Sequence, residues 1–111
     1  MAEYHRLLEP NLLAASENSE RDRVYDAGAY PRLYAQVRVV APGSAGTIAL
    51  QHAAVKEADA WLDLSGTSVN LNALSNNYIE ISGFLRYIRW TTDGAVAGSP
   101  KVIIDLVAKE A

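Results

Sequence analysis

The segment LYAQVRVV, residues Leu33–Val40, alternates apolar and polar side chains almost without interruption. A period of two residues is typical of a β-strand that buries one face and exposes the other. The segment GTIALQH, residues Gly46–His52, repeats this pattern after a loop that contains Pro42 and Gly43. Two alternating segments joined by a short Pro- and Gly-containing loop predict a β-hairpin.

The same alternation continues toward the C-terminus in five more short segments: Trp61–Leu64, Thr67–Asn72, Tyr78–Ser82, Phe84–Thr91 and Lys101–Lys109. Two less regular segments, Leu12–Ser16 and Arg21–Asp26, are candidate strands near the N-terminus. Ala53–Ala60 has a helix-forming composition, but its eight residues favour a turn or loop. Eight or nine short strands at intervals of roughly ten residues predict an all-β chain. We expect one antiparallel two-sheet β-sandwich, jelly-roll-like or immunoglobulin-like in outline.

Size and composition exclude several classes of protein. A chain of 111 residues corresponds to one domain. It contains no cysteine, which excludes disulfides, thiolate metal sites and a cysteine nucleophile. The net charge of −3 argues against a generally basic surface for nucleic acid. No apolar run approaches the roughly 20 residues that cross a membrane, and no secretory signal precedes the first strand. We therefore expect a soluble chain made in the cytoplasm.

The sequence contains no pattern typical of an active site. No serine lies in a G-x-S-x-G motif, and the two histidines, His5 and His52, are far apart in the sequence. The carboxylates are scattered and form no ligand cluster. The sequence predicts no catalytic residue, no metal site and no cofactor, and thus a protein that is not an enzyme.

The first 19 residues form a candidate arm ahead of a sandwich domain at residues 20–111. Its leucines would be exposed if the arm were free, and exposed leucine pairs indicate a partner surface. The other interpretation is that this segment pairs with the sandwich as an edge strand. The residues of the arm that we select as candidate contacts are Tyr4, Leu7, Leu8 and Leu12.

Two aromatic clusters are further candidates for contacts. FLRYIRW, Phe84–Trp90, places an arginine between apolar neighbours on each face of a strand, a composition enriched in interface hot spots. The structural alternative is that one arginine pairs with a carboxylate such as Asp63, Glu80 or Asp105, while the other covers apolar surface at the rim. Near Pro31, a group of tyrosines could form a subunit contact or an ordinary sandwich edge. The candidates from both clusters are Tyr30, Tyr34, Arg86, Arg89 and Trp90.

Four segments carry a resemblance to a known group of proteins. They are D-x-G-x-Y-P-x-L-x-x-Q-V-x-V at Asp26–Val39, G-T-I-x-L-Q-H at Gly46–His52, A-W-L-D-L at Ala60–Leu64 and G-F-L-R-Y-I-R-W at Gly83–Trp90. This order resembles small β-sandwich virion proteins of tailed bacteriophages, including capsid decoration (cement) proteins and tail accessory modules. The resemblance spans about residues 20–109, and its motifs describe a sandwich core.

The resemblance implies a non-enzymatic role on a virion, most often outside the major capsid shell. It implies contacts with the major capsid protein or other virion subunits, and a homo-oligomer, with a trimer favoured. The net charge and the short apolar runs, rather than the resemblance, predict no binding of nucleic acid or membrane. Similar strand patterns occur in discoidin-like and other carbohydrate-binding modules. The alternative is therefore a carbohydrate- or receptor-binding module with Trp61, Tyr87 or Trp90 as the stacking platform.

Overall fold

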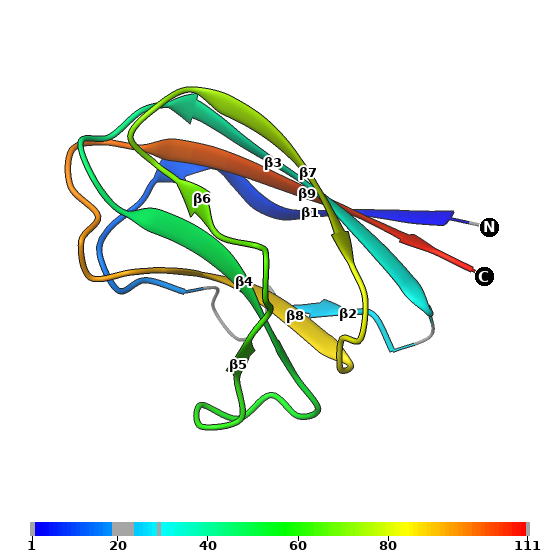
Figure 1. Cartoon of the computed structure of the whole chain (residues 1–111). Coiled ribbons are helices and arrows are strands. Elements are labelled where there is room, and N and C mark those ends of the chain that lie inside the picture. The colour runs from blue at the N-terminus through cyan, green and yellow to red at the C-terminus, as the bar shows by residue number, and fades with distance from the viewer. Residues whose placement is uncertain (1, 19–23, 29, 111) are drawn as a thin grey trace.

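The computed structural model describes residues 2–18, 24–28 and 30–110, and these residues form nine strands in two sheets (Figure 1). One sheet has the strand order β1-β9-β3-β7, and the other has the order β2-β8-β4-β5, with β6 also paired to β4. All of the pairings are antiparallel. The strands are β1 (Ala2–Leu12), β2 (Tyr25–Asp26), β3 (Arg32–Ala41), β4 (Thr47–Ala53), β5 (Leu62–Asp63), β6 (Val69–Asn70), β7 (Ser75–Ile81), β8 (Tyr87–Thr92) and β9 (Lys101–Lys109).

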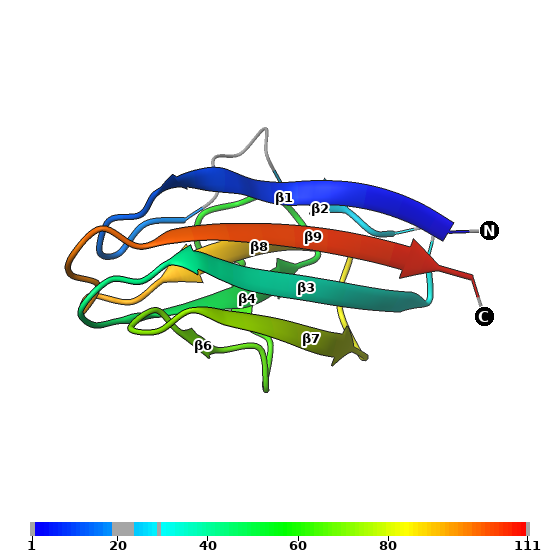
Figure 2. The ribbon, with the colours of Figure 1, turned by 90° about the horizontal axis from the view of Figure 1, so that it is seen from above.

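The two sheets pack face to face, which confirms the predicted all-β sandwich. Figure 2 shows the strands of one sheet lying over those of the other. The alternation in β3 and β9 buries one face of each strand in the space between the sheets. That space holds aliphatic side chains that are completely or almost completely buried, among them Leu33, Val37, Ile48, Leu50, Ile88, Ile104 and Leu106. Burial of this apolar surface is the main term that stabilises the fold.

The candidate arm is an edge strand of the sandwich along its described residues. β1 pairs with β9 from Ala2↔Lys109 to Leu12↔Lys101, with register shifts after Arg6 and Leu8. The irregularity turns two successive leucines, Leu7 and Leu8, into the core, where they are 3% and 6% exposed. The division into an arm at 1–19 and a sandwich at 20–111 is therefore corrected, because this strand supplies part of the core.

The predicted hairpin between β3 and β4 is wrong. β3 pairs with β7 and β9, whereas β4 pairs with β5, β6 and β8, so the loop between them crosses from one sheet to the other. The crossing is tight at Gly46, which has a φ of +106° and lies so near Val96 that a Cβ would be 2.5 Å from the Val96 Cα. Alternation identified both strands but not their partners, because a strand buries one face in either sheet.

Other boundaries differ modestly from the expectation. β8 begins at Tyr87 rather than Phe84, and Ala53–Ala60 contains the end of β4 followed by turns. β9 has the predicted bounds Lys101–Lys109 and buries the predicted face. Part of the candidate strand Arg21–Asp26 lies outside the described residues, and its last two residues form β2. In the described part of the chain, no helix has the length and apolar character of a membrane span.

Candidate functional site: a tyrosine face on one sheet

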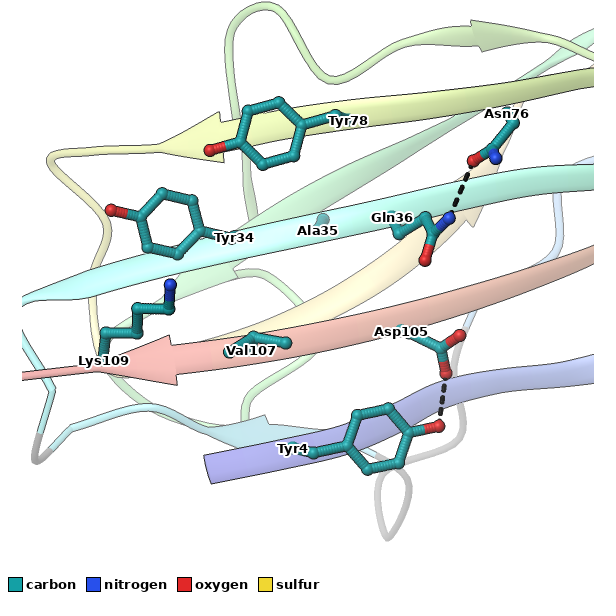
Figure 3. A pocket seen from close by; sticks show the side chains of 9 residues that line it. All are labelled: Tyr4, Tyr34, Ala35, Gln36, Asn76, Tyr78, Asp105, Val107 and Lys109. Atoms are coloured by element: carbon teal, nitrogen blue, oxygen red, sulfur yellow. Dashed lines mark hydrogen bonds between the residues drawn. The ribbon is translucent and has the colours of Figure 1, made fainter. Parts of the chain in front are cut away.

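The outer face of the β1-β9-β3-β7 sheet contains a shallow hollow of about 570 Å³. Its side chains come from all four strands, as Figure 3 shows. We call it the tyrosine face and define it by its lining residues: Tyr4, Tyr34, Ala35, Gln36, Asn76, Tyr78, Asp105, Val107 and Lys109. The outward positions of β3, β7 and β9 place most of these residues together, since each strand buries its alternate side chains. Tyr4 comes from β1, and Ala35 is a buried position of β3.

Three tyrosines provide the apolar surface of this face. Tyr78 and Tyr4 are among the most exposed large side chains of the described residues, at 71% and 59%, and Tyr34 is half-buried. The rings of Tyr34 and Tyr78 are nearly parallel, with an interplanar angle of 16° and centroids 6.0 Å apart. In Figure 3 both rings present their faces outward next to one another. The pair therefore forms a flat aromatic surface open to solvent.

Asp105 fixes the third tyrosine. Its carboxylate is buried and accepts hydrogen bonds from the Tyr4 hydroxyl (2.6 Å), the Arg6 Nε (2.8 Å) and the Arg38 Nη2 (3.0 Å). Burial acts to raise the pKa of Asp105, but the hydrogen bonds from Arg6, Tyr4 and Arg38 outweigh it and hold the pKa below its usual range. The hydrogen bond to Asp105 raises the pKa of Tyr4. Tyr4 is thus held in place as a neutral phenol.

Two amides lie between the tyrosines and are only partly satisfied. Gln36 Nε2 donates to Asn76 Oδ1 across β3 and β7 at 2.9 Å. This bond orients both side chains and leaves the Gln36 Oε1 acceptor and the Asn76 Nδ2 donors without a partner among the described residues. The hydroxyls of Tyr34 and Tyr78 likewise have no hydrogen-bond partner in that part of the chain. A ligand on this face would meet oriented donors and acceptors beside flat rings.

Only two of the sequence-predicted contact residues, Tyr4 and Tyr34, lie on the tyrosine face. Leu7 and Leu8 are in the core, and so is Trp90, at 7% exposed, which corrects its assignment as a contact or stacking residue. The side chain of Leu12 lies outside the described residues.

The other predicted residues lie elsewhere and have intramolecular partners. Arg86 pairs with Asp26 (2.9 Å) rather than with any of the carboxylates that we expected. Arg89 donates to Gln51 (2.8 Å), and the Tyr30 hydroxyl donates to Glu3 (3.2 Å).

Sequence reasoning missed Gln36, Asn76, Tyr78, Asp105 and Lys109 as members of one site. One signal was present, because the alternation that turns Ile79 inward also turns Tyr78 outward. The pairing of β3 with both β7 and β9 brings the set together, and that pairing links residues up to 77 positions apart, as for Arg32 and Lys109.

A scan against protein-family models, a search of curated proteins and a search of solved structures each found no match. The site is therefore interpreted from its own geometry. Within the described residues, no group of three or more His, Asp or Glu side chains is placed to hold a metal ion.

Proposed function

We propose that this chain is a non-enzymatic carbohydrate-binding module and that the tyrosine face is its binding surface. The observation that carries the proposal is the pair of outward-facing rings, Tyr34 and Tyr78, beside the unsatisfied atoms of Gln36 and Asn76. A pyranose ring has flat C–H faces that pack on aromatic rings, and its rim of hydroxyls both donates and accepts hydrogen bonds. The tyrosine face offers a complement to each.

Preorganisation supports this proposal. Tyr4 is held by Asp105, and the two amides are held by one another, so few side-chain rotamers remain to be fixed when a ligand binds. The hollow is wide and shallow rather than enclosed, and it runs across four strands (Figure 3). Such a surface suits a chain of sugar units better than a small molecule, which needs to bury most of its own surface.

The test is binding of the full chain to a panel of neutral and anionic polysaccharides, followed by Tyr34→Ala and Tyr78→Ala. We expect binding to at least one glycan and a loss of about tenfold in affinity for each variant, which corresponds to about 1.4 kcal/mol. Circular dichroism serves to confirm that both variants are folded. Leu74→Ala is the matched control, since Leu74 is 66% exposed and does not line the hollow. Failure to bind any glycan, or binding by both tyrosine variants as tight as that of the wild type, would contradict the proposal.

The second candidate is the virion structural protein, a capsid decoration protein that binds the outside of the shell. It requires a surface for contacts between subunits, and two exposed leucines favour it. Leu62 (57% exposed) pairs with His52 across β4 and β5, and the backbone N–H of Leu85 (41% exposed) donates to His52 Nδ1 at 3.0 Å. Both leucines thus lie near His52 on the β2-β8-β4-β5 sheet, away from the tyrosine face.

Light scattering after size exclusion tests this second candidate. A subunit contact at these leucines predicts a trimer or another closed cluster that Leu62→Glu with Leu85→Glu dissociates and Leu74→Glu does not. A monomer at every concentration would count against assembly through this surface. A gene for a capsid or tail protein beside the coding gene would favour the virion role.

A further inference from the structure

We infer that the glycan bound by the tyrosine face is anionic, and that Lys109 and Arg32 bind its carboxylate or sulfate groups. The inference rests on the proposed function, because it names the class of carbohydrate for that same surface. Its evidence is the distribution of charged side chains on the sheet, which is independent of the tyrosines that support the proposed function.

Lys109 and Arg32 are placed directly opposite one another on neighbouring strands. The pairing of β3 with β9 puts them in register, and both occupy the outward face, where their side chains are exposed. Like charges directly opposite on adjacent strands destabilise a sheet. Neither residue has an ion pair with any residue that the structure describes. An anionic ligand would turn this unfavourable pair into a binding site.

This cationic pair is continuous with the aromatic surface. Lys109 lines the hollow, and its Nζ lies 5.0 Å from the centroid of the Tyr34 ring (Figure 3). Tyr34 is two residues from Arg32 on the same face of β3. A sugar unit packed on Tyr34 would therefore place its substituents within reach of the Lys109 ammonium group and near the Arg32 guanidinium.

The rest of the sheet has the same sign of charge. Asp105 is a single carboxylate that accepts hydrogen bonds from two arginines, so this cluster has a net positive charge. Outward-facing cations of the described strands outnumber the carboxylates, although the whole chain has a net charge of −3. The cations are Arg6, Arg32, Arg38, Lys101 and Lys109, and the carboxylates are Asp105, Glu80 and the exposed Glu9 of β1.

The polar groups favour an acidic polysaccharide over single-stranded nucleic acid. Stacked bases come with a phosphate at every nucleotide, and binding them needs a positively charged groove along the backbone. Here Glu80 lies beside Tyr34, directly opposite it on β7, where it would repel a continuous row of phosphates. Gln36 and Asn76 occupy the centre of the face with neutral donors and acceptors that match hydroxyls. Neutral groups thus separate Lys109 and Arg32, at one end of the β3–β9 pairing, from Arg38 farther along β3.

The experiment compares polygalacturonate, alginate, hyaluronate and heparan sulfate with neutral xylan, mannan and soluble starch, using the full chain. We expect at least one anionic polymer to bind more tightly than every neutral one, and its affinity to fall as salt rises. Lys109→Gln and Arg32→Gln should each lower that affinity about fivefold. The matched control is Lys101→Gln, which removes the same charge from the same face of β9 at its other end and should change affinity less than twofold.

The outcomes separate this inference from the function on which it rests. Equal binding of neutral polymers, with loss in the tyrosine variants, would overturn the anionic ligand and keep the carbohydrate module. Equal losses in Lys101→Gln and Lys109→Gln would show attraction by overall charge and overturn the assigned pair. Binding of single-stranded oligonucleotides without any glycan would overturn both proposals in favour of nucleic acid, and no binding to any polymer would overturn both.

Discussion

The two sheets of the sandwich carry similar residues on their outer faces and use them differently. On the β2-β8-β4-β5 sheet, Arg89 donates to Gln51 (2.8 Å), and Gln51 donates to Asp63 (2.9 Å). The Arg89 guanidinium also covers the ring of Trp61, 4.5 Å from its centroid. The arginine, amide, carboxylate and aromatic ring of this face are all engaged within the chain.

On the β1-β9-β3-β7 sheet the comparable groups remain open to solvent. Gln36 and Asn76 satisfy each other only in part. The rings of Tyr34 and Tyr78 face outward, and the Lys109 ammonium, 5.0 Å from the Tyr34 centroid, is the one cation of the described residues next to them. The most extensively hydrogen-bonded side chain of this sheet is Asp105, which holds Tyr4 in place, although the buried Nε of Arg38 has no hydrogen-bond partner among the described residues. The comparison teaches that residue types alone do not distinguish a binding face from a structural one. The distinction lies in which polar atoms remain without intramolecular partners.

The largest effect that we predict comes from Asp105→Asn. Removing the charge leaves Arg6 and Arg38 without their carboxylate, and loss of one partner of a largely buried pair costs several kcal/mol. Because both arginines are about one-third exposed, we expect the free energy of unfolding to fall by about 3 kcal/mol, the lower end of that range. Urea denaturation measures it. Asp63→Asn on the other sheet is the control and should cost less than about 0.5 kcal/mol, because Asp63 is exposed. If both variants lost the same free energy of unfolding, the two outer faces would not differ in how strongly their carboxylates are held.

The same carboxylate predicts how stability depends on pH. The pKa of Asp105 is lowered in the folded chain, so its contribution is complete above the unfolded-state pKa of about 3.9. It is lost as the pH falls through the lower folded-state pKa. The difference in unfolding free energy between wild type and Asp105→Asn should thus stay constant from pH 7 to about pH 5 and shrink below pH 4. Denaturation curves at pH 7, 5, 4 and 3 measure this, and a difference that grows with acid would contradict the lowered pKa.

The sequence predicted the elements of this fold far better than the site. Alternation identified β3, β4 and β9 and their buried faces, since a period of two is a local property. The prediction of Trp90 as a contact residue is wrong because local alternation does not reveal that Trp90 lies in the core. Nor does it reveal that Arg89 donates to Gln51 on β4. The tyrosine face depends on strand order, which is set by packing between segments distant in the chain. Tyr34 was selected and Tyr78 was not, although they are neighbours in the structure.

A smaller effect is expected from Trp61→Ala, which tests whether the second face is purely structural. The substitution removes the contact with Arg89 and the burial of a half-exposed indole, so we expect a loss of about 1 kcal/mol in unfolding free energy. Glycan affinity should change less than twofold, because Trp61 does not line the hollow. Isothermal titration measures the affinity in parallel with urea denaturation. A tenfold loss of affinity would show that the glycan binds on the β2-β8-β4-β5 sheet and not on the tyrosine face.

The smallest effect comes from Gln36→Leu and concerns the hydrogen bonds of the tyrosine face. The variant keeps the size of the side chain but removes both the bond to Asn76 and the free Oε1 acceptor. Because a net hydrogen bond contributes about 0.5–1.5 kcal/mol, we expect affinity for the bound glycan to fall about threefold to fivefold. The unfolding free energy should change by less than about 0.5 kcal/mol, since both amides are exposed.

Gln51→Leu on the opposite face is the matched comparison and should show the reverse. It deprives Arg89 of its acceptor and Asp63 of its donor, so stability falls while affinity stays the same. A double-mutant cycle of Gln36→Leu with Asn76→Ala then sharpens the contrast. If the two amides orient each other for the ligand, their effects on affinity are not additive, because either substitution alone disorders the other side chain. Additive effects would mean that each amide meets the glycan independently and that their mutual hydrogen bond does not organise the site.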